Sequence, residues 1–193
     1  LFVAASDSHQ VLMVNLTTSL VFLFAGTGVQ GYSGDGGSAT AATLRFPTFL
    51  SVSGNGTQLI VSDTYNRVVR EIDISLGTIT TVAGAHSGGS HCNNCPATSA
   101  ILTGPTGIAT FPDGRLVISD TDIDRNGFYG GVIRIVENGI IRTIAGVDGA
   151  NWGSTGTGNA LTAAMNTPMG VETLPNGDIV FVDSKNLILR RLN

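Results

Sequence analysis

The sequence is poor in charge and has no long apolar run. Only 12% of its 193 residues are charged, the net charge is −4, and nearly all of the ten basic residues are arginine. A protein that reads nucleic acid usually carries a basic face, so this balance argues against a nucleic-acid partner. No apolar run reaches the roughly 18 residues that a membrane helix needs, so we expect no membrane span in this segment.

Familiar catalytic patterns are missing as well. The sequence contains no Gly-x-Ser-x-Gly elbow, no phosphate-binding loop and no evident Ser-His-Asp set. The three histidines, His9, His86 and His91, do not recur at equivalent places along the chain. We therefore expect no catalytic residue, no enzymatic activity and no cofactor.

What the chain does contain is a repeat. An Ala-Gly pair closes an apolar run at Gly26, Gly84 and Gly146, about every 60 residues. A proline opens the next run about 20 residues after each of these glycines. A period of this length indicates one structural unit that is copied along the chain.

Each copy consists of short β-branched runs separated by turn residues. The second copy has such runs at 48–52, 59–63, 67–72 and 78–82, which predicts a four-stranded antiparallel meander. The first and last copies are partial, so we expect three, four, four and three strands, fourteen in all, with no long helix. Four-stranded units at this spacing are typical of β-propeller blades, so the predicted fold class is all-β.

The repeat also predicts how the chain is divided. We expect a partial blade with its inter-blade loop at 1–46, blades with loops at 47–104 and 105–167, and a partial blade at 168–193. Three and a half blades do not close a ring, and the chain starts inside a strand. We therefore expect a segment of a longer protein, with a half-ring that closes by dimerisation as the alternative.

Two parts of the sequence resemble NHL repeats. Residues 59–73 read Leu-Ile-Val-Ser-Asp-Thr-Tyr-Asn-Arg-Val-Val-Arg-Glu-Ile-Asp, and residues 77–84 continue the match with Gly-Thr-Ile-Thr-Thr-Val-Ala-Gly. The Gly-rich residues 26–40 are similar to the long inter-blade loop of one subgroup of NHL propellers. The resemblance implies a propeller fold. For function it implies several classes: protein- or RNA-binding scaffolds, extracellular receptor domains and a few lyases.

The inter-blade loops share a packing signature. Small residues and then a large apolar residue stand at nearly the same distance before each proline, and the large residues are Leu44, Leu102 and Met165. Recurring apolar positions usually belong to a core. We expect each of these side chains to pack against the blade body.

The two cysteines lie in the second of these loops. Cys92 and Cys95 stand where the other copies have the ends of a Gly-rich tight turn, and a tight turn brings its ends close enough for a disulfide. A disulfide is the favoured prediction. The alternatives are a zinc site that also uses His86 and His91, a redox motif, and free thiols or pairing with other cysteines.

Two glycosylation sequons fall in predicted turns. Asn15 lies in a turn between third and fourth strands and Asn55 in a turn between first and second strands. In an antiparallel blade these two kinds of turn project from the same face. With a disulfide in the same chain, we predict N-linked glycans on this face, and bare hydrated turns are the alternative.

The opposite face carries the inter-blade loops, and loops on a rigid scaffold commonly bind partners. The candidate partner-binding residues there are Tyr32, Asp35, Phe128, Tyr129 and Trp152. A cluster of aromatic side chains would anchor a partner protein or a sugar. The competing interpretation is that each aromatic side chain covers the blade beneath it.

Aspartates recur at the ends of second strands. Asp63, Asp120 and Asp183 occupy this place, and Asp7 is a candidate fourth member. Repetition in every blade indicates a structural role, because aspartate side chains readily accept backbone N–H bonds at turns.

The third copy adds two further acids to this position. Asp122 and Asp124 extend Asp120 into an Asp-x-Asp-x-Asp spacing of the kind that binds calcium. No suitably placed glutamate follows, so a solvated insertion is favoured over a metal site.

These features together predict a non-enzymatic β-propeller scaffold for protein–protein interaction, adhesion or assembly, including assembly into an extracellular fibre. The expected location is extracellular or at the cell surface. The expected partners are further copies or other extracellular proteins, with N-linked glycans attached. Two alternatives stay open: a propeller lyase or hydrolase with a metal in its central channel, and an intracellular propeller that binds protein or RNA.

Overall fold

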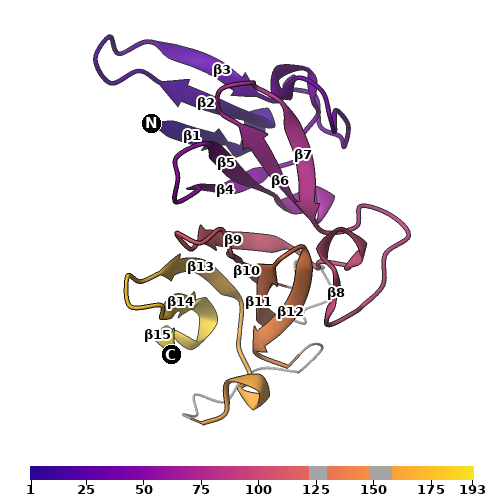
Figure 1. Cartoon of the computed structure of the whole chain (residues 1–193), viewed down its shortest axis with the longest axis vertical. Coiled ribbons are helices and arrows are strands. Elements are labelled where there is room, and N and C mark those ends of the chain that lie inside the picture. Colours follow the sequence, from indigo (N-terminus) through magenta and orange to yellow (C-terminus); the bar gives the residue numbers. More distant parts are fainter. Residues whose placement is uncertain (122–129, 148–157) are drawn as a thin grey trace.

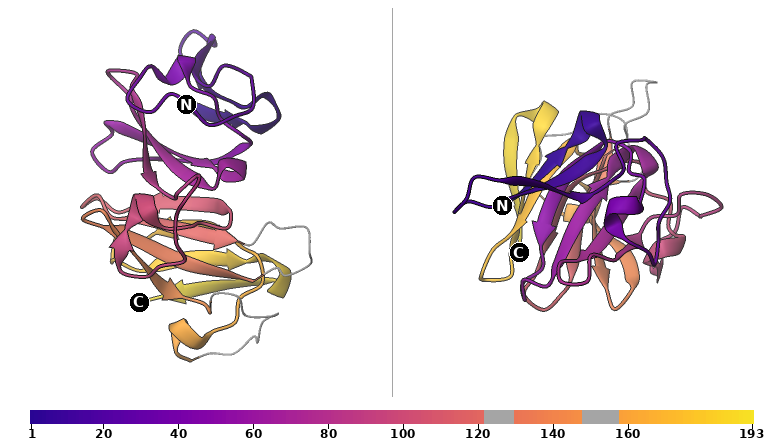
Figure 2. Two further views of the ribbon diagram at one scale, coloured as in Figure 1. Left: turned by 90° about the vertical axis from the view of Figure 1, so that its right-hand side faces the viewer. Right: turned by 90° about the horizontal axis from the view of Figure 1, so that it is seen from above.

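The computed structural model describes residues 1–121, 130–147 and 158–193. These residues form antiparallel sheets joined by turns and loops, with short 3-10 segments and no α-helix in the described part of the chain. The first three sheets follow one another in chain order along the long axis of the molecule, and the last sheet lies beside the third (Figure 1). The left view of Figure 2 shows the same succession, with the N-terminus in the first sheet and the C-terminus in the last.

The sheets are the blades of a β-propeller. Blade one contains β1 (Phe2–Ala5), β2 (Gln10–Val14) and β3 (Val21–Ala25). Blade two contains β4 (Pro47–Val52), β5 (Gln58–Asp63), β6 (Val68–Asp73) and β7 (Ile79–Ala83). Blade three contains β9 (Pro105–Thr110), β10 (Leu116–Thr121), β11 (Gly131–Glu137) and β12 (Ile140–Ala145). Blade four contains β13 (Pro168–Thr173), β14 (Ile179–Asp183) and β15 (Ile188–Leu192). Within every blade, strands that are consecutive in sequence pair antiparallel.

One strand beyond the expected fourteen joins blade three. The two-residue strand β8 (Cys95–Pro96) pairs with β12, where Pro96 faces Ile140 and Cys95 faces Ile141. It lies in the loop that leaves blade two, so this loop covers the outer edge of the following blade. Covering an edge strand removes a row of unpaired backbone groups that would otherwise attract other chains. A two-residue strand has no alternating pattern, which is why the sequence did not predict it.

The repeated Ala-Gly pairs have a common structural reason. The N–H groups of Gly26, Gly84 and Gly146 each donate to the first residue of the 3-10 turn in the loop that follows, at 2.9 Å in all three cases. Each glycine has φ near +90°, which residues with a side chain rarely adopt. A Cβ on Gly84 would also lie 2.4 Å from the carbonyl oxygen of Arg67. The glycine is therefore required where the loop leaves the blade.

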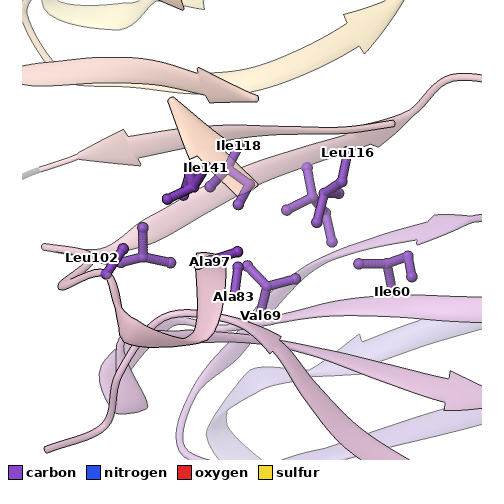
Figure 3. Close-up of a cluster of buried hydrophobic side chains, with 10 residues drawn as sticks. Ile60, Val69, Ala83, Ala97, Leu102, Leu116, Ile118 and Ile141 are labelled. Atoms are coloured by element: carbon purple, nitrogen blue, oxygen red, sulfur yellow. The ribbon is translucent and has the colours of Figure 1, made fainter. Parts of the chain in front are cut away.

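The core lies between successive blades. Three clusters of buried apolar side chains join blade one to two, two to three, and three to four. Figure 3 shows the middle cluster, whose labelled members are Ile60, Val69, Ala83, Ala97, Leu102, Leu116, Ile118 and Ile141. Leu44, Leu102 and Met165 are no more than 2% exposed, and each belongs to a different cluster. The loop residues expected to pack against the blades are thus part of the core.

The inner strands differ at the third residue of each, which is Phe49 in β4, Gly107 in β9 and Gly170 in β13. Gly107 of β9 lies so close to β13 that a Cβ would be 2.2 Å from the Met169 carbonyl oxygen. The corresponding residue of β4 is Phe49, and its ring lies 3.8 Å from the Cβ position of Gly170. Gly107 therefore allows β9 and β13 to approach each other closely, and the Phe49 ring of β4 fills the space beside Gly170.

Candidate functional site

The side of the molecule that bears the inter-blade loops and the turns between second and third strands is called the loop face here. On its outer part, Tyr32 and His86 stack with ring centroids 4.3 Å apart and an interplanar angle of 15°. The Tyr32 hydroxyl also makes hydrogen bonds with Asp35 (3.1 Å) and Thr81 (2.9 Å). Tyr32 therefore covers blade two, as the structural interpretation of the loop aromatics expected.

Arg70 of β6 connects this loop to blade two through hydrogen bonds. Its side chain is fully buried, and its Cζ lies 5.1 Å from the centroid of the Tyr32 ring. The Nη2 group donates to the Ser33 carbonyl oxygen at 3.1 Å and to Asp35 at 2.7 Å. Nη1 lies 3.6 Å from the Asp63 carboxylate. Tyr32 and Asp35, two of the candidate partner-binding residues, are thus engaged within the fold.

The recurring aspartates hold the ends of the inter-blade loops. Asp63 accepts the backbone N–H of Arg45 at 2.6 Å, and Asp183 accepts that of Asn166 at 2.7 Å. Asp120 accepts the backbone N–H groups that directly precede Pro105, at 2.8 and 2.9 Å. The carboxylates accept backbone hydrogen bonds as expected, but these come from the incoming loop. In blades two and four the turn that follows the aspartate contributes a side-chain donor, Asn66 or Asn186.

The candidate fourth member, Asp7, does not occupy this place in blade one. Asp63 directly precedes a 3-10 turn, and in blade one Ala5 stands at that place. Asp7 lies one position inside the turn and is exposed. The first copy therefore has no carboxylate at the position of Asp63. The turn is short and polar, so the sequence alone does not fix which of its residues corresponds to Asp63.

Burial dominates the titration of Asp63. It raises the pKa of this carboxyl to about 6, against the opposing effects of Asn66, the Arg45 N–H and Arg70. Burial likewise raises the pKa of Asp120. For both carboxyls, desolvation therefore outweighs the stabilisation of the charged form by the neighbouring hydrogen-bond donors and arginine.

This shift predicts the direction of a pH effect. The pKa of Asp63 is higher in the folded state than in the unfolded state, so protonation of this carboxyl favours folding. Its contribution to the free energy of unfolding is complete below about pH 4 and is lost as pH rises through about 6. Relative to an Asp63→Asn variant, the wild-type free energy of unfolding should fall over this window. Denaturant titrations of both proteins from pH 4 to 7, with the Asp63 carboxyl followed by NMR, measure it. A carboxyl that titrates near its ordinary value would contradict the prediction.

Cys92 and Cys95 form a disulfide, with an S–S distance of 1.98 Å. The loop that they close presents the Cys92 carbonyl oxygen to Nη2 of Arg134 at 2.5 Å. Arg134 holds the place in blade three that Arg70 holds in blade two. The disulfide loop therefore supplies the acceptor that Asp35 and Ser33 supply one blade earlier.

The zinc alternative loses its cysteine ligands in this arrangement. The sulfurs of Cys92 and Cys95 are bonded to each other, and His86 is stacked on Tyr32, so the zinc set with His91 is not assembled. No group of three or more potential metal ligands is found among the described residues. Asp122 and Asp124 of the calcium alternative lie outside the described residues, as do Phe128, Tyr129 and Trp152.

A second aromatic group on the loop face was not predicted. This group, the inner aromatic cluster, consists of His9, Arg45, Phe46 and Tyr65. The Phe46 ring lies 5.0 Å from His9 and 4.9 Å from Tyr65, measured between centroids, and Arg45 lies over the Tyr65 ring at 5.9 Å. Tyr65 is 48% exposed and Arg45 is also exposed. These residues present an aromatic and cationic surface to solvent.

The backbone holds this cluster firmly. Phe46 donates its N–H to Nδ1 of His9 at 3.2 Å, and Tyr65 donates its N–H to the Arg45 carbonyl oxygen at 3.1 Å. Phe46 has φ +51° directly before Pro47, a strained combination for a residue with a side chain. The sequence feature that could have indicated this cluster is Phe46, because the other copies have the non-aromatic residues Gly104 and Thr167 before their prolines.

The two sequon asparagines are exposed at turns. Asn15 lies between β2 and β3, and Asn55 between β4 and β5. The Asn55 Oδ1 atom accepts bonds from the Thr57 N–H (3.1 Å) and hydroxyl (2.8 Å), and Asn15 Oδ1 accepts the Thr17 N–H at 2.9 Å. Both side chains are accessible, and their glycosylation stays a prediction. Within the described residues, no helix has the length and hydropathy needed to cross a membrane.

No protein-family model and no curated protein matches the sequence significantly. Solved structures are similar in fold. A Bacteroides thetaiotaomicron protein of unknown function has a TM-score of 0.71 at 18% identity, over 96% of this chain and 42% of its own. An auxiliary nutrient binding protein from the same organism has a TM-score of 0.70 at 13% identity, over 100% and 44%. Virginiamycin B lyase from Staphylococcus aureus has a TM-score of 0.55 at 14% identity, over 99% and 50%.

These similarities concern six-bladed β-propellers and show the fold alone. The chain spans half or less of the length of the three structures. The predicted propeller fold is confirmed, and membership of the NHL subgroup stays a prediction.

Proposed function

We propose that this chain is part of a non-enzymatic propeller that binds a protein partner through the inner aromatic cluster of its loop face. The observation that carries the proposal is the exposure of Tyr65 and Arg45 on a backbone fastened by hydrogen bonds. Tyrosine and arginine are enriched among residues that dominate binding energy. A surface that is ordered before binding also costs less conformational entropy when the partner arrives.

An interaction role fits the described inner strands better than catalysis does. Strands β4, β9 and β13 carry a single ionisable residue, Glu172. Acid–base chemistry in a central channel needs several converging titratable groups. The enzymatic alternative, a lyase or hydrolase with a metal in the channel, would therefore have to draw its ligands from other parts of the ring.

We further propose a secreted or surface-displayed glycoprotein that works in adhesion or assembly. The disulfide, the two exposed sequons and the low content of charge support this location. N-linked glycans on Asn15 or Asn55 of the native protein would exclude the intracellular alternative. A reduced cytosolic form that binds RNA would instead exclude the proposed location.

Tyr65→Ala tests the proposed binding surface. We expect it to weaken capture of the partner at least tenfold, because it removes an exposed aromatic side chain without opening the core. The measurement is crosslinking of intact cells with a membrane-impermeant reagent, followed by purification and quantitative mass spectrometry. Leu76→Ala, which truncates a side chain that is 75% exposed elsewhere on the blade, is the matched control. Identical partner sets for the two variants would overturn the proposal.

A further inference from the structure

The face opposite the loop face has a cavity between blades two and three. Its volume is about 440 Å³. It lies beneath the turn that joins β4 to β5 and the turn that joins β9 to β10, with Ile60, Leu116 and Val136 among its apolar lining. Ile60 and Leu116 also belong to the core cluster between these blades, so the apolar wall of the cavity is continuous with the core (Figure 3).

Contacts between the two blades form the rim of the cavity. The two turns meet where Gly54 approaches Pro112, and a Cβ on Gly54 would lie 2.6 Å from the Pro112 Cα. Closer to the inner strands, the Thr110 hydroxyl donates to the Val52 carbonyl oxygen at 3.1 Å. The cavity is thus held open between fixed points of two packed blades.

Glu71 supplies the charge of this cavity. It stands on β6, is half-buried and lines the cavity, and no hydrogen bond or ion pair is found for its carboxylate among the described residues. The only other charged lining residue is Asp113, whose carboxylate is engaged by Arg115 at 2.9 Å. No lysine, arginine or histidine lines the cavity.

Glu71 is not explained by the packing of the repeat. The strand registers place Met13 at the same position in blade one, Ile135 in blade three and Arg191 in blade four. Ile135 is 3% exposed in the apolar cluster that joins blade three to blade four. A half-buried carboxylate at a position that is apolar in both neighbouring blades is costly unless something compensates its charge.

We propose that this cavity binds an alkylammonium group, with Glu71 as its counter-ion. The apolar lining suits a short methylene chain, and the unpaired carboxylate suits the ammonium head. The same chemistry is carried by a lysine side chain of a partner protein and by a small free amine. The inference concerns a different face from the proposed partner surface and does not depend on it.

Titration calorimetry with two probes, n-pentylammonium chloride and N-acetyl-lysine amide, tests the proposal at neutral pH. Protein that carries no sugar on Asn55 is used, because Asn55 lines the cavity. We expect saturable binding of at least one probe and at least tenfold weaker binding of that probe to Glu71→Gln. Tighter binding of the lysine derivative would assign the site to a partner's side chain, and tighter binding of pentylammonium to a free amine.

Two further variants and a neutral probe sharpen the test. Glu71→Ile introduces the residue that blade three has at this position and should abolish binding while keeping the fold. Glu172→Gln removes an exposed carboxylate on β13 and should leave binding unchanged. 1-Pentanol has a similar chain without the charge and should bind at least tenfold more weakly than pentylammonium. Equal affinity of wild type and Glu71→Gln, equal binding of pentanol, or no saturable binding of either amine would overturn the proposal.

Discussion

Replacing Arg70 with alanine is expected to lower the free energy of unfolding by about 3–5 kcal/mol, the usual cost of breaking a buried ion pair from one side. Arg70 is fully buried and contacts Asp63, Asp35 and the Ser33 carbonyl oxygen. Its loss leaves the Asp63 carboxylate buried with a weaker set of partners. The first inter-blade loop also loses the side chain that fastens it to blade two. Denaturant unfolding at pH 7 measures the effect.

Two comparisons separate the ion pair from a general loss of packing. Arg142→Ala truncates an exposed arginine of β12 and should change stability by less than about 0.5 kcal/mol. In a double-mutant cycle of Arg70→Ala with Asp63→Asn, we expect a coupling energy above about 1 kcal/mol, because the two groups share one network. A loss below about 1 kcal/mol for Arg70→Ala, or additive effects in the cycle, would show that the pair is not important for the fold.

The second large effect is expected for Leu102→Ala, at about 3 kcal/mol of lost stability. Leu102 is 0% exposed and lies in the cluster between blades two and three, although it belongs to a loop. Truncating a buried leucine removes its transfer free energy and leaves a cavity, which together cost roughly 2–5 kcal/mol. Thermal or denaturant unfolding of the purified variant provides the measurement.

Leu161→Ala is the matched control, since Leu161 lies in the corresponding loop one blade later and is 52% exposed. It should cost less than about 0.5 kcal/mol. Leu44→Ala, in the first loop, should resemble Leu102→Ala because Leu44 is also 0% exposed. If Leu102→Ala and Leu161→Ala cost the same, the loops would be peripheral to the core.

Most of the blade architecture was predictable because it depends on local signals. Alternating β-branched runs and Gly-containing turns placed the strands of blade two within about two residues of their observed bounds. The recurrence of a large apolar residue at a fixed place before each proline also identified Leu44, Leu102 and Met165 as packing residues. Each of these features repeats along the chain, so one copy supports the interpretation of the next.

The arrangement of the polar groups was less predictable. The sequence marked Asp63, Asp120 and Asp183 as structural, but their backbone partners lie in the preceding loop and become adjacent only when the blade folds against it. The sequence predicted Tyr32 as a candidate partner-binding residue, whereas in the fold its ring contacts His86 and Arg70. The inner aromatic cluster joins two turns and a loop end, and no local pattern connects them.

The sequence by itself determined the repeated four-stranded unit, the turns that bear Asn15 and Asn55, and the loop residues that enter the core. These follow from alternation, turn chemistry and spacing, which act over a few residues. Only the tertiary structure decided which polar side chains find partners, because that depends on which side of each strand meets the next blade. It paired the buried Arg70 with Asp63 and Asp35, exposed Tyr65, and left the Glu71 carboxylate unpaired in a cavity.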